Sequence, residues 1–285
     1  MIAEPVGQRV SRWGEGPVWH HDRLFHVDIE GHAIVAHDPN GEHETVWNLG
    51  RRIGFVVPRR NGGFIAGGDD GLFFFDSVSG ATEAIAHPES DKPNNRFNDG
   101  KCAPDGRLFA GTISLAKITG DAKLYRLDAD LSLATAYGPV TNSNGLAWSP
   151  DGATLHYIDT PTRRVLAFDY ESETGALLNP RVAFSTDALC DASPDGMAAD
   201  AEGKLWIAFC HGGCVIRIDP KDGRELARIP VPALETTSVA FGGPGLRHLY
   251  ITTGIHAKIQ EPLGGRLFLV ENMPAPGLPV FPFAG

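Results

Sequence analysis

The sequence of 285 residues predicts an all-β fold, a six-bladed β-propeller with four-stranded blades around a central channel. Three observations predict it. A segment made of a polar residue, a short strand, a turn and a second strand recurs six times. The copies start 39 to 51 residues apart, which is the spacing of one propeller blade per repeat. The 3.6-residue apolar period that helical repeats require is absent.

The first two strands of each blade are clearest in the middle of the chain. NDGKCAPDGRLFAGT, NGLAWSPDGATLHYIDT and DGMAADAEGKLWIAF align directly with one another. With one-residue slips at the turn, the same template fits EGPVWHHDRLFHVD, GFVVPRRNGGFIAGG and TSVAFGGPGLRHLYITT. The six copies begin at Glu15, Gly54, Asn98, Asn144, Asp195 and Thr237.

The third strand of five units ends on an aspartate, whose short side chain can hydrogen-bond the backbone of the following turn. We interpret these aspartates as structural, and they are Asp38, Asp76, Asp128, Asp169 and Asp219. The sixth unit has GGRLFLVE as its third strand and lacks a convincing fourth. Residues 4–12 belong to no blade, so we expect the N-terminal strand to close the ring and cover two sheet edges.

No long polar or low-complexity linker interrupts the chain, so residues 1–285 are predicted to form one domain. The formal net charge is −10 and no basic run is present, which argues against nucleic acid or anionic membrane as partners. The N-terminus has no signal-peptide pattern, and we expect a cytoplasmic protein. Four cysteines without CxxC spacing are expected to be reduced buried thiols. The oligomeric state is left open.

In a propeller the inner strand of every blade lines the channel, so the first residues of the six repeats should meet at one mouth. Two carboxylates, two carboxamides and one hydroxyl would then surround one point. Carboxylates that are close together in a buried channel repel unless a cation lies between them. Oxygen ligands favour Ca²⁺, Mg²⁺ or Mn²⁺, although Zn²⁺ and Fe²⁺ also accept carboxylate. The alternative is that these residues only cap strands and bridge blades by hydrogen bonds.

Four motifs carry a resemblance to a known family: GEGPVW at 14–19, RFNDGK at 96–101, NGLAWSPDG at 144–152 and PDGMAAD at 194–200. Together they resemble the senescence marker protein (regucalcin), gluconolactonase and luciferin-regenerating enzyme family, in family order over almost the whole chain. The resemblance implies a six-bladed propeller of the sugar-lactone hydrolase type with one divalent metal ion.

Carried over by position, the resemblance implies metal ligation by Glu15, Asn144 and Asp195, and substrate binding by Arg96 and Asn98. Some relatives have a substrate-binding glutamate shortly after the second strand of the Asn98 blade. Here TISLAKITGD places Leu115 and Ala116 near that position, which leaves the identity of the lactone open.

The expected reaction is hydrolysis of a small aldonolactone to the aldonic acid. A divalent metal would polarise the carbonyl and lower the pKa of a bound water. Asp195 is the expected general base and Glu15 a ligand only. Arg96 offers a planar fork of donors to sugar hydroxyls or to the developing oxyanion, and Asn98 offers a donor and an acceptor to a hydroxyl.

Two long loops follow second strands on the same predicted mouth, ISLAKITGDAK from Ile113 and GIHAKIQEPLGG from Gly254, and either could form a lid or a specificity wall. Further candidates near the mouth, with roles left open, are Arg51, Arg52, His211 and His256. The sequence has no GxSxG elbow, HExxH motif or nucleotide-binding glycine motif.

Two alternatives to the sugar lactonase remain. One is a calcium-binding or protein-interaction propeller whose channel metal is structural. The other keeps the hydrolase and changes its substrate to non-sugar lactones or phosphotriesters, although Arg96 and Asn98 favour a polyol.

Overall fold

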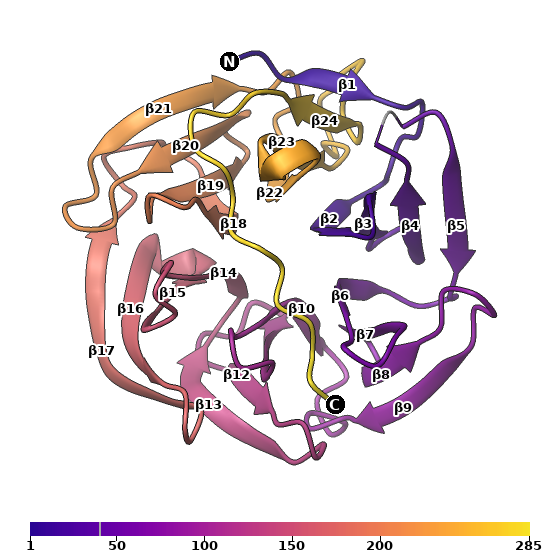
Figure 1. Ribbon diagram of the computed structural model, residues 1–285, viewed down its shortest axis with the longest axis vertical. Helices are drawn as coiled ribbons and strands as arrows, with labels where there is room; N and C mark the ends of the chain where they lie inside the picture. Colours follow the sequence, from indigo (N-terminus) through magenta and orange to yellow (C-terminus); the bar gives the residue numbers. More distant parts are fainter. Residues whose placement is uncertain (40) are drawn as a thin grey trace.

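In the computed structural model, residues 1–39 and 41–285 are described, and within them 24 strands form six four-stranded antiparallel sheets. The sheets are arranged around one axis like the blades of a propeller (Figure 1). The inner strands are β2 (Gly14–His20), β6 (Ile53–Pro58), β10 (Asn95–Cys102), β14 (Ser143–Trp148), β18 (Ser193–Ala199) and β22 (Thr236–Gly242). The predicted all-β six-bladed fold is therefore confirmed.

The other strands follow outward in chain order. The second strands are β3 (Arg23–Asp28), β7 (Phe64–Gly68), β11 (Leu108–Ser114), β15 (Thr154–Asp159), β19 (Leu205–Cys210) and β23 (His248–Thr253). The third strands are β4 (Ala33–His37), β8 (Gly71–Phe75), β12 (Ala122–Leu127), β16 (Arg164–Glu171), β20 (Cys214–Ile218) and β24 (Leu267–Val270). The outer strands are β5 (Glu44–Asn48), β9 (Thr82–Ala86), β13 (Leu133–Val140), β17 (Ala176–Ser185), β21 (Glu225–Pro230) and β1 (Glu4–Val6).

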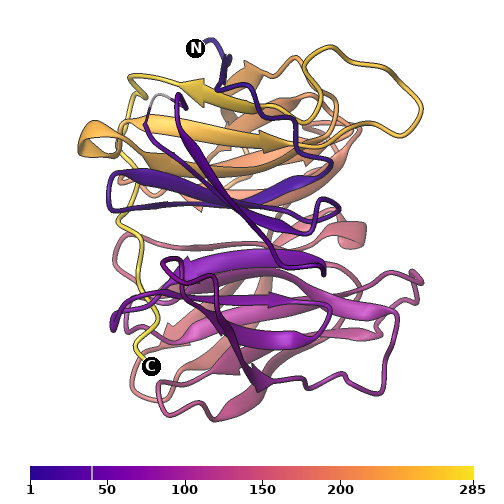
Figure 2. The same cartoon turned by 90° about the vertical axis from the view of Figure 1, so that its right-hand side faces the viewer.

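The ring closes as the sequence predicts, because the N-terminal strand completes the last blade. β1 pairs antiparallel with β24, with Glu4 opposite Leu269 and Val6 opposite Leu267. The two strands lie side by side at the ring's edge (Figures 1 and 2). The first and last strands of the chain are thereby hydrogen-bonded in one sheet, and β1 covers the edge that β24 would otherwise expose.

Side-chain burial falls from the second strands to the outer strands. Every residue of β19 is buried, including Trp206 and Phe209, whereas most of β13 and β17 is exposed or half-buried. The apolar clusters are formed largely between neighbouring blades, as where Phe25 of β3 packs on Phe64 of β7 with ring centroids 4.5 Å apart. Burial between blades therefore holds the ring together.

The aspartates at the ends of the third strands serve the turns and edges, as expected. Asp76 accepts backbone N–H groups of Val78 and Ser79, and Asp219 accepts that of Lys221. In two other blades arginine side chains take this place, since Asp128 pairs with Arg107 and Arg126, and Asp169 with Arg181.

The C-terminal segment, residues 271–285, crosses one end of the channel (Figures 1 and 2). It is bound to several blades, because Ala201 N–H donates to Pro276, Phe283 N–H to Pro58 and Ala284 N–H to Gly106. Between this segment and the inner strands lies a cavity of about 100 Å³, lined by residues of all six inner strands and by Leu278–Phe281.

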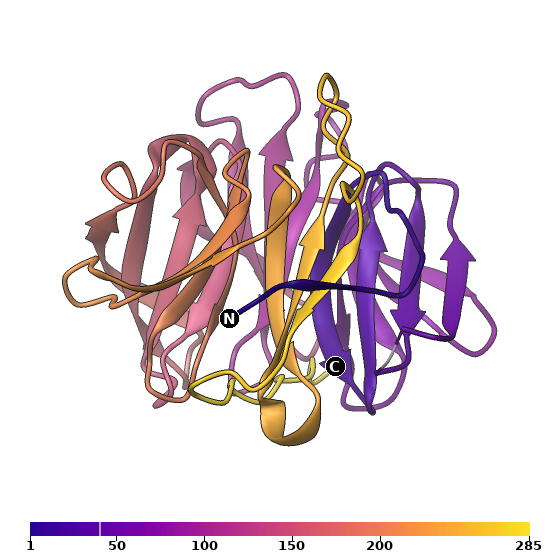
Figure 3. The same cartoon turned by 90° about the horizontal axis from the view of Figure 1, so that it is seen from above.

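The long loops β11–β12 and β23–β24 project from the opposite end of the channel (Figure 3). That end is also where the inner strands begin, so it is the predicted mouth. Two short 3₁₀ turns complete the structure, η1 (Thr160–Thr162) and η2 (Pro244–Leu246). No helix among the described residues is long and apolar enough to cross a membrane.

Candidate metal centre and active site

All six inner strands carry a β-bulge near their first residues. The register with the second strand shifts between Glu15 and Val18, Ile53 and Phe55, Phe97 and Asp99, Asn144 and Leu146, Pro194 and Met197, and Thr236 and Ser238. A bulge changes the direction in which a side chain points and commonly occurs beside active sites. The bulges fall at or beside the repeat starts, but the registers differ: Glu15 and Asn144 precede the bulge, whereas Asn98, Asp195 and the remaining repeat starts lie within it.

Glycines allow the inner strands to approach one another at this level. A Cβ atom on Gly145 would lie 2.5 Å from the backbone oxygen of Asp195, and one on Gly54 would lie 2.5 Å from that of Asn98. Because no side chain fits at either position, neighbouring strand starts are held close together across the blade boundaries.

Glu15, Asn144 and Asp195 meet at the mouth of the channel. Asn144 and Glu15 lie close enough to Asp195 to influence the pKa of its carboxyl group. The three residues expose only 7%, 4% and 6% of their surface, respectively. Backbone and side-chain groups fix two of them: Gly16 N–H donates to Glu15 Oε2 at 2.7 Å, and Asn144 Nδ2 donates to Thr160 Oγ1 at 3.1 Å.

The electrostatics of this cluster are those of crowded buried acids. Burial, together with the charges of Asp195 and Asp99, raises the pKa of Glu15 well above its ordinary value. Burial is also the main reason why the pKa of Asp195 rises to about 7. The carboxyl group of Asp99 lies in the same channel, and burial raises its pKa as well.

Two cations face these three acids. Lys101 extends across the channel, where its Nζ donates to the Met197 carbonyl at 2.7 Å, and burial lowers the pKa of its ammonium group. Arg96 is the second. If Glu15, Asp99 and Asp195 are all ionised, their three negative charges exceed the two positive charges of Lys101 and Arg96. The donors at Glu15, Asn144 and Asp195 are oxygen atoms, so the residues present fit a hard divalent cation.

Arg96 and Asn98 lie on β10 and contact each other. Arg96 is buried, and its guanidinium donates to the Phe97 carbonyl at 2.9 Å and to Asn98 Oδ1 at 2.8 Å. Burial lowers the pKa of Arg96 to about 10, which keeps it charged at neutral pH. Its Nε has no hydrogen-bond partner among the described residues.

The amide of Asn98 is engaged by the protein. Its Nδ2 donates to Asn142 Oδ1 at 3.1 Å and to the Ser143 carbonyl at 2.9 Å. Both N–H groups are thus used, and only Oδ1 retains accepting capacity. Asn98 therefore orients Arg96 and connects β10 to the neighbouring blade. The sequence led us to expect that its amide would also donate a hydrogen bond to a substrate hydroxyl, but here its N–H groups bind the protein.

The arginines of LGRRIG are paired with acids of their own blade. Arg52 Nε binds Asp69 at 3.1 Å, and Arg51 binds Asp70 at 3.3 Å while its guanidinium carbon lies 4.4 Å from the Phe73 ring centroid. Neither arginine contacts Glu15 or Asp195. The positive charge of Arg52 lies near enough to Arg96 to lower the pKa of Arg96 further.

Three residues of the mouth escaped the sequence interpretation: Asp99, Lys101 and Glu235. Asp99 and Lys101 lie inside a motif that was recognised, but the bulge at Asn98 alters which of its side chains face the channel. Glu235 precedes the sixth repeat by two residues, and its charge acts on Asp195. The only sign of Glu235 in the sequence is that an acidic residue stands just before the start of the sixth repeat.

The predicted histidines lie on either side of Glu235. His211 Nδ1 is 2.7 Å from Glu235 Oε2, and His256 Nε2 is 3.8 Å from Glu235 Oε1. In the β11–β12 loop the Leu115 N–H is bound to the Asn94 carbonyl at 2.8 Å. These contacts place both long loops at the rim of the mouth.

Residues 13–255 match the family model described as SMP-30/gluconolactonase/LRE-like region. A Danio rerio relative named regucalcin is 38% identical over 99% of this chain and 98% of its own length. A Bacillus subtilis relative named "Putative sugar lactone lactonase YvrE" is 35% identical over 95% of both chains.

Solved structures agree with the sequence match. A luciferin-regenerating enzyme superposes with a TM-score of 0.93 at 29% identity, over 100% of this chain and 99% of the other. A calcium-binding protein, regucalcin, from Agrobacterium tumefaciens has a TM-score of 0.93 at 25% identity, over 99% of this chain and 97% of the other. This chain therefore belongs to the SMP-30/gluconolactonase/LRE family of six-bladed β-propellers.

Proposed function

We propose that this protein is a divalent-metal-dependent lactonase that opens a small aldonolactone to the aldonic acid. One observation carries the proposal: Glu15, Asn144 and Asp195 bring buried oxygen ligands together at the end of the channel that the C-terminal segment leaves uncovered. Family membership adds support, because the family name includes gluconolactonase and a relative is named as a sugar lactone lactonase.

In this proposal Glu15, Asn144 and Asp195 hold the cation. When bound, a divalent metal supplies Lewis acidity toward the ester carbonyl and makes water easier to deprotonate. Ca²⁺, Mg²⁺ and Mn²⁺ suit the oxygen donors best, and Zn²⁺ and Fe²⁺ also accept carboxylates.

The chain's own residues move the protons and orient the lactone. Asp195 accepts a proton from the attacking water at a carboxylate oxygen, which is the role of a general base. The departing ring oxygen then needs a proton, which the newly protonated Asp195 carboxyl can return. Glu15, whose raised pKa a bound cation would offset, would be ionised in the loaded site and would act as a ligand only.

Arg96 provides the fixed positive charge of the site. Its guanidinium is held by Phe97 and Asn98 before substrate arrives, so little reorganisation is needed to stabilise negative charge on the carbonyl oxygen. The unpartnered Nε–H is a donor suited to a sugar hydroxyl. A polyol lactone suits this polar wall better than an apolar ester.

The test uses the whole chain, stripped of metal with a chelator and then resupplied with single divalent cations. Glucono-, xylono-, arabinono- and galactonolactone are offered in turn, and acid release is followed with a pH indicator. We expect a metal-restored rate well above spontaneous hydrolysis for at least one lactone. No metal-restored rate with any of them contradicts the proposal.

A second candidate is a calcium-binding protein without hydrolytic activity. It is favoured by the relatives named regucalcin and by the Agrobacterium structure described as a calcium-binding protein. Calcium binding by isothermal titration, combined with no lactone turnover in the assay above, would favour this second candidate.

A further inference from the structure

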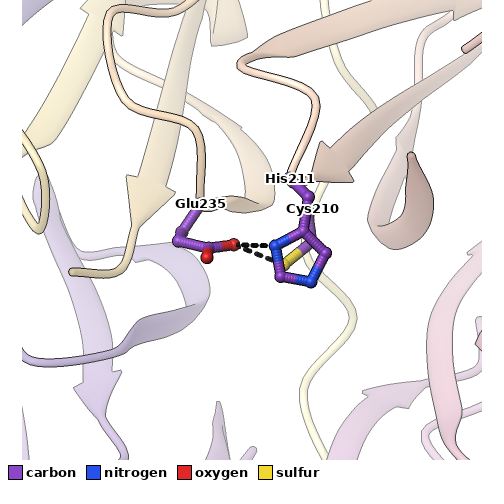
Figure 4. Close-up of side chains that lie close together, drawn as sticks. All are labelled: Cys210, His211 and Glu235. Atoms are coloured by element: carbon purple, nitrogen blue, oxygen red, sulfur yellow. Dashed lines mark hydrogen bonds and ion pairs between the residues drawn. The ribbon is translucent and has the colours of Figure 1, made fainter. Parts of the chain in front are cut away.

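A cluster of metal-binding side chains lies beside the channel site and shares no ligand with it. Cys210 Sγ, His211 Nδ1 and a carboxylate oxygen of Glu235 all lie within 4.8 Å of one another. Cys210 Sγ donates to Glu235 Oε2 at 3.1 Å, and His211 Nδ1 lies 2.7 Å from the same oxygen (Figure 4). Cys210 and Glu235 are buried, whereas the His211 side chain is 58% exposed.

The backbone explains how two successive residues reach one carboxylate. Neighbouring side chains in a strand normally point to opposite faces. Cys210 is the last residue of β19, and His211 takes a left-handed conformation with φ 68° at the start of the turn. A non-glycine residue in this region is uncommon and marks a position worth explaining. Here it turns the imidazole toward the side on which the thiol points (Figure 4).

Glu235 is held in place from the other blade. Residues Cys210 and Glu235 form an isolated antiparallel bridge, and the Glu235 carbonyl accepts the Gly254 N–H at 2.8 Å. The backbones that carry thiol and carboxylate are therefore fixed relative to each other before any ion binds, which favours binding because less ordering is needed.

His256 supports Glu235 from the outside. Its Nδ1 accepts the N–H groups of Lys258 and Ile259 at 3.0 and 2.9 Å, so the proton of the neutral ring resides on Nε2. His256 Nε2 lies 3.8 Å from Glu235 Oε1, the oxygen that does not face Cys210 and His211. This distance is too long for a hydrogen bond, but it places the His256 donor on the side of the Glu235 carboxylate where an outer partner of a ligand would lie.

We propose that Cys210, His211 and Glu235 form a second metal site, at the rim of the mouth, for a thiophilic divalent ion of the zinc class. Thiolate, imidazole and carboxylate together are typical zinc ligands, and three of them leave one position open toward solvent. Binding forms three coordinate bonds and releases the thiol proton of Cys210 to solvent. The channel site differs in chemistry, since its donors are oxygen atoms alone.

The distances require only a small adjustment. Ligand atoms around a tetrahedral zinc ion with ordinary bond lengths lie about 3.3 to 3.5 Å apart. The Cys210–Glu235 and His211–Glu235 pairs, at 3.1 and 2.7 Å, must open by about half an ångström, and the Cys210 and His211 atoms already lie within 4.8 Å of each other. The exposed imidazole of His211 can move within its own pair, and the Cys210–Glu235 pair opens through its side chains.

The experiment titrates Co²⁺ into the metal-free whole protein and records the near-ultraviolet absorption. Only a sulfur ligand gives a thiolate-to-cobalt charge-transfer band. Co²⁺ bound by the oxygen ligands of the channel site therefore does not contribute to this band. We expect a saturable band in the wild type and in Asp195→Asn, whatever the outcome of the lactone assay. The band should disappear in Cys210→Ser and require roughly tenfold or more Co²⁺ in His211→Asn.

Cys102→Ser and Cys214→Ser are the matched controls, because each removes another buried thiol and should keep the band. His211→Asn alters an exposed side chain, which keeps the test valid should Cys210→Ser fail to fold. Absence of a band in the wild type, persistence of the band in Cys210→Ser, or unchanged Co²⁺ affinity in His211→Asn would each overturn the proposal.

Discussion

Asp195 is the residue on which metal binding and proton transfer both depend in this account. Its carboxyl group lies beside Asn144 and Glu15, and its pKa of about 7 follows mainly from burial. Because Asp195 has both roles, replacing it should reduce lactone turnover and metal affinity together.

Asp195→Asn keeps the volume and removes the charge. We expect kcat on the best aldonolactone to fall by about 10²- to 10⁴-fold, together with weaker metal binding measured by titration calorimetry. Asp219→Asn, at a turn far from the mouth, is the matched control and should change neither quantity. Full activity in Asp195→Asn would contradict the assigned role.

Asn98→Ala tests a positioning role. Its Oδ1 holds the Arg96 guanidinium at 2.8 Å, and the substitution would release it. We expect KM to rise severalfold while metal affinity is unchanged, with Asn179→Ala on exposed β17 as control. Loss of metal affinity equal to that in Asp195→Asn would mean that Asn98 is itself a ligand.

The repeats predicted that Glu15, Asn144 and Asp195 would lie at one mouth together with the other repeat starts, and the family resemblance singled out these three. The same logic could not find Cys210, whose side-chain direction depends on the left-handed turn at His211. Nor could it show that both N–H groups of Asn98 are used by a neighbouring blade. Both features depend on individual backbone angles and on contacts between blades, which a repeat pattern does not encode.

At the scale of the strand, β3 and β4 carry a buried histidine pair. His26 Nδ1 bonds the Val27 carbonyl at 3.1 Å and therefore donates, so His26 Nε2 accepts from His37 Nε2 at 3.0 Å. Burial lowers the pKa of His26 to about 4 and, with the charge of His26, that of His37 to about 3. Both rings are neutral in the folded protein at neutral pH.

The pair predicts a loss of stability in mild acid. Because both folded pKa values lie below the unfolded value of 6.5, the unfolded chain binds protons first as the pH falls. The contribution is fully present above pH 6.5 and declines toward pH 4. Between pH 7 and 5 the free energy of unfolding should drop by up to about 2 kcal/mol for each histidine.

Urea unfolding at pH 7 and 5, on chelator-treated wild type and on a variant without the pair, measures this contribution as the difference between the two proteins, because the raised pKa of Asp195 contributes with the opposite sign in the same interval. The double variant His26→Leu/His37→Leu removes both titrations and should lose less stability over the same interval. An identical decrease in wild type and double variant would show that the pair does not control the acid response.

At the scale of the whole molecule, the ring is closed by β1 and one end of the channel is covered by residues 271–285. Ring closure could be predicted, since the sixth repeat lacked a fourth strand and an unassigned segment preceded the first. The path of the C-terminal segment could not be predicted, because it belongs to no repeat and its hydrogen bonds reach blades that are distant in sequence.

Phe283 anchors that segment and has no exposed surface. It packs with Leu108, Leu127 and their neighbours, so Phe283→Ala should lower the free energy of unfolding by about 3 to 5 kcal/mol. Val280→Ala, at a partly exposed position of the same segment, is the control. Equal, small losses in both variants would show that the segment contributes little to stability.

The central claim is that the channel mouth holds a divalent cation between Glu15, Asn144 and Asp195. Anomalous diffraction from crystals of the protein with Mn²⁺ tests it most directly, because manganese prefers oxygen ligands. We expect an anomalous peak in contact with all three side chains. A crystal saturated with Mn²⁺ that has no peak at these residues would contradict the account.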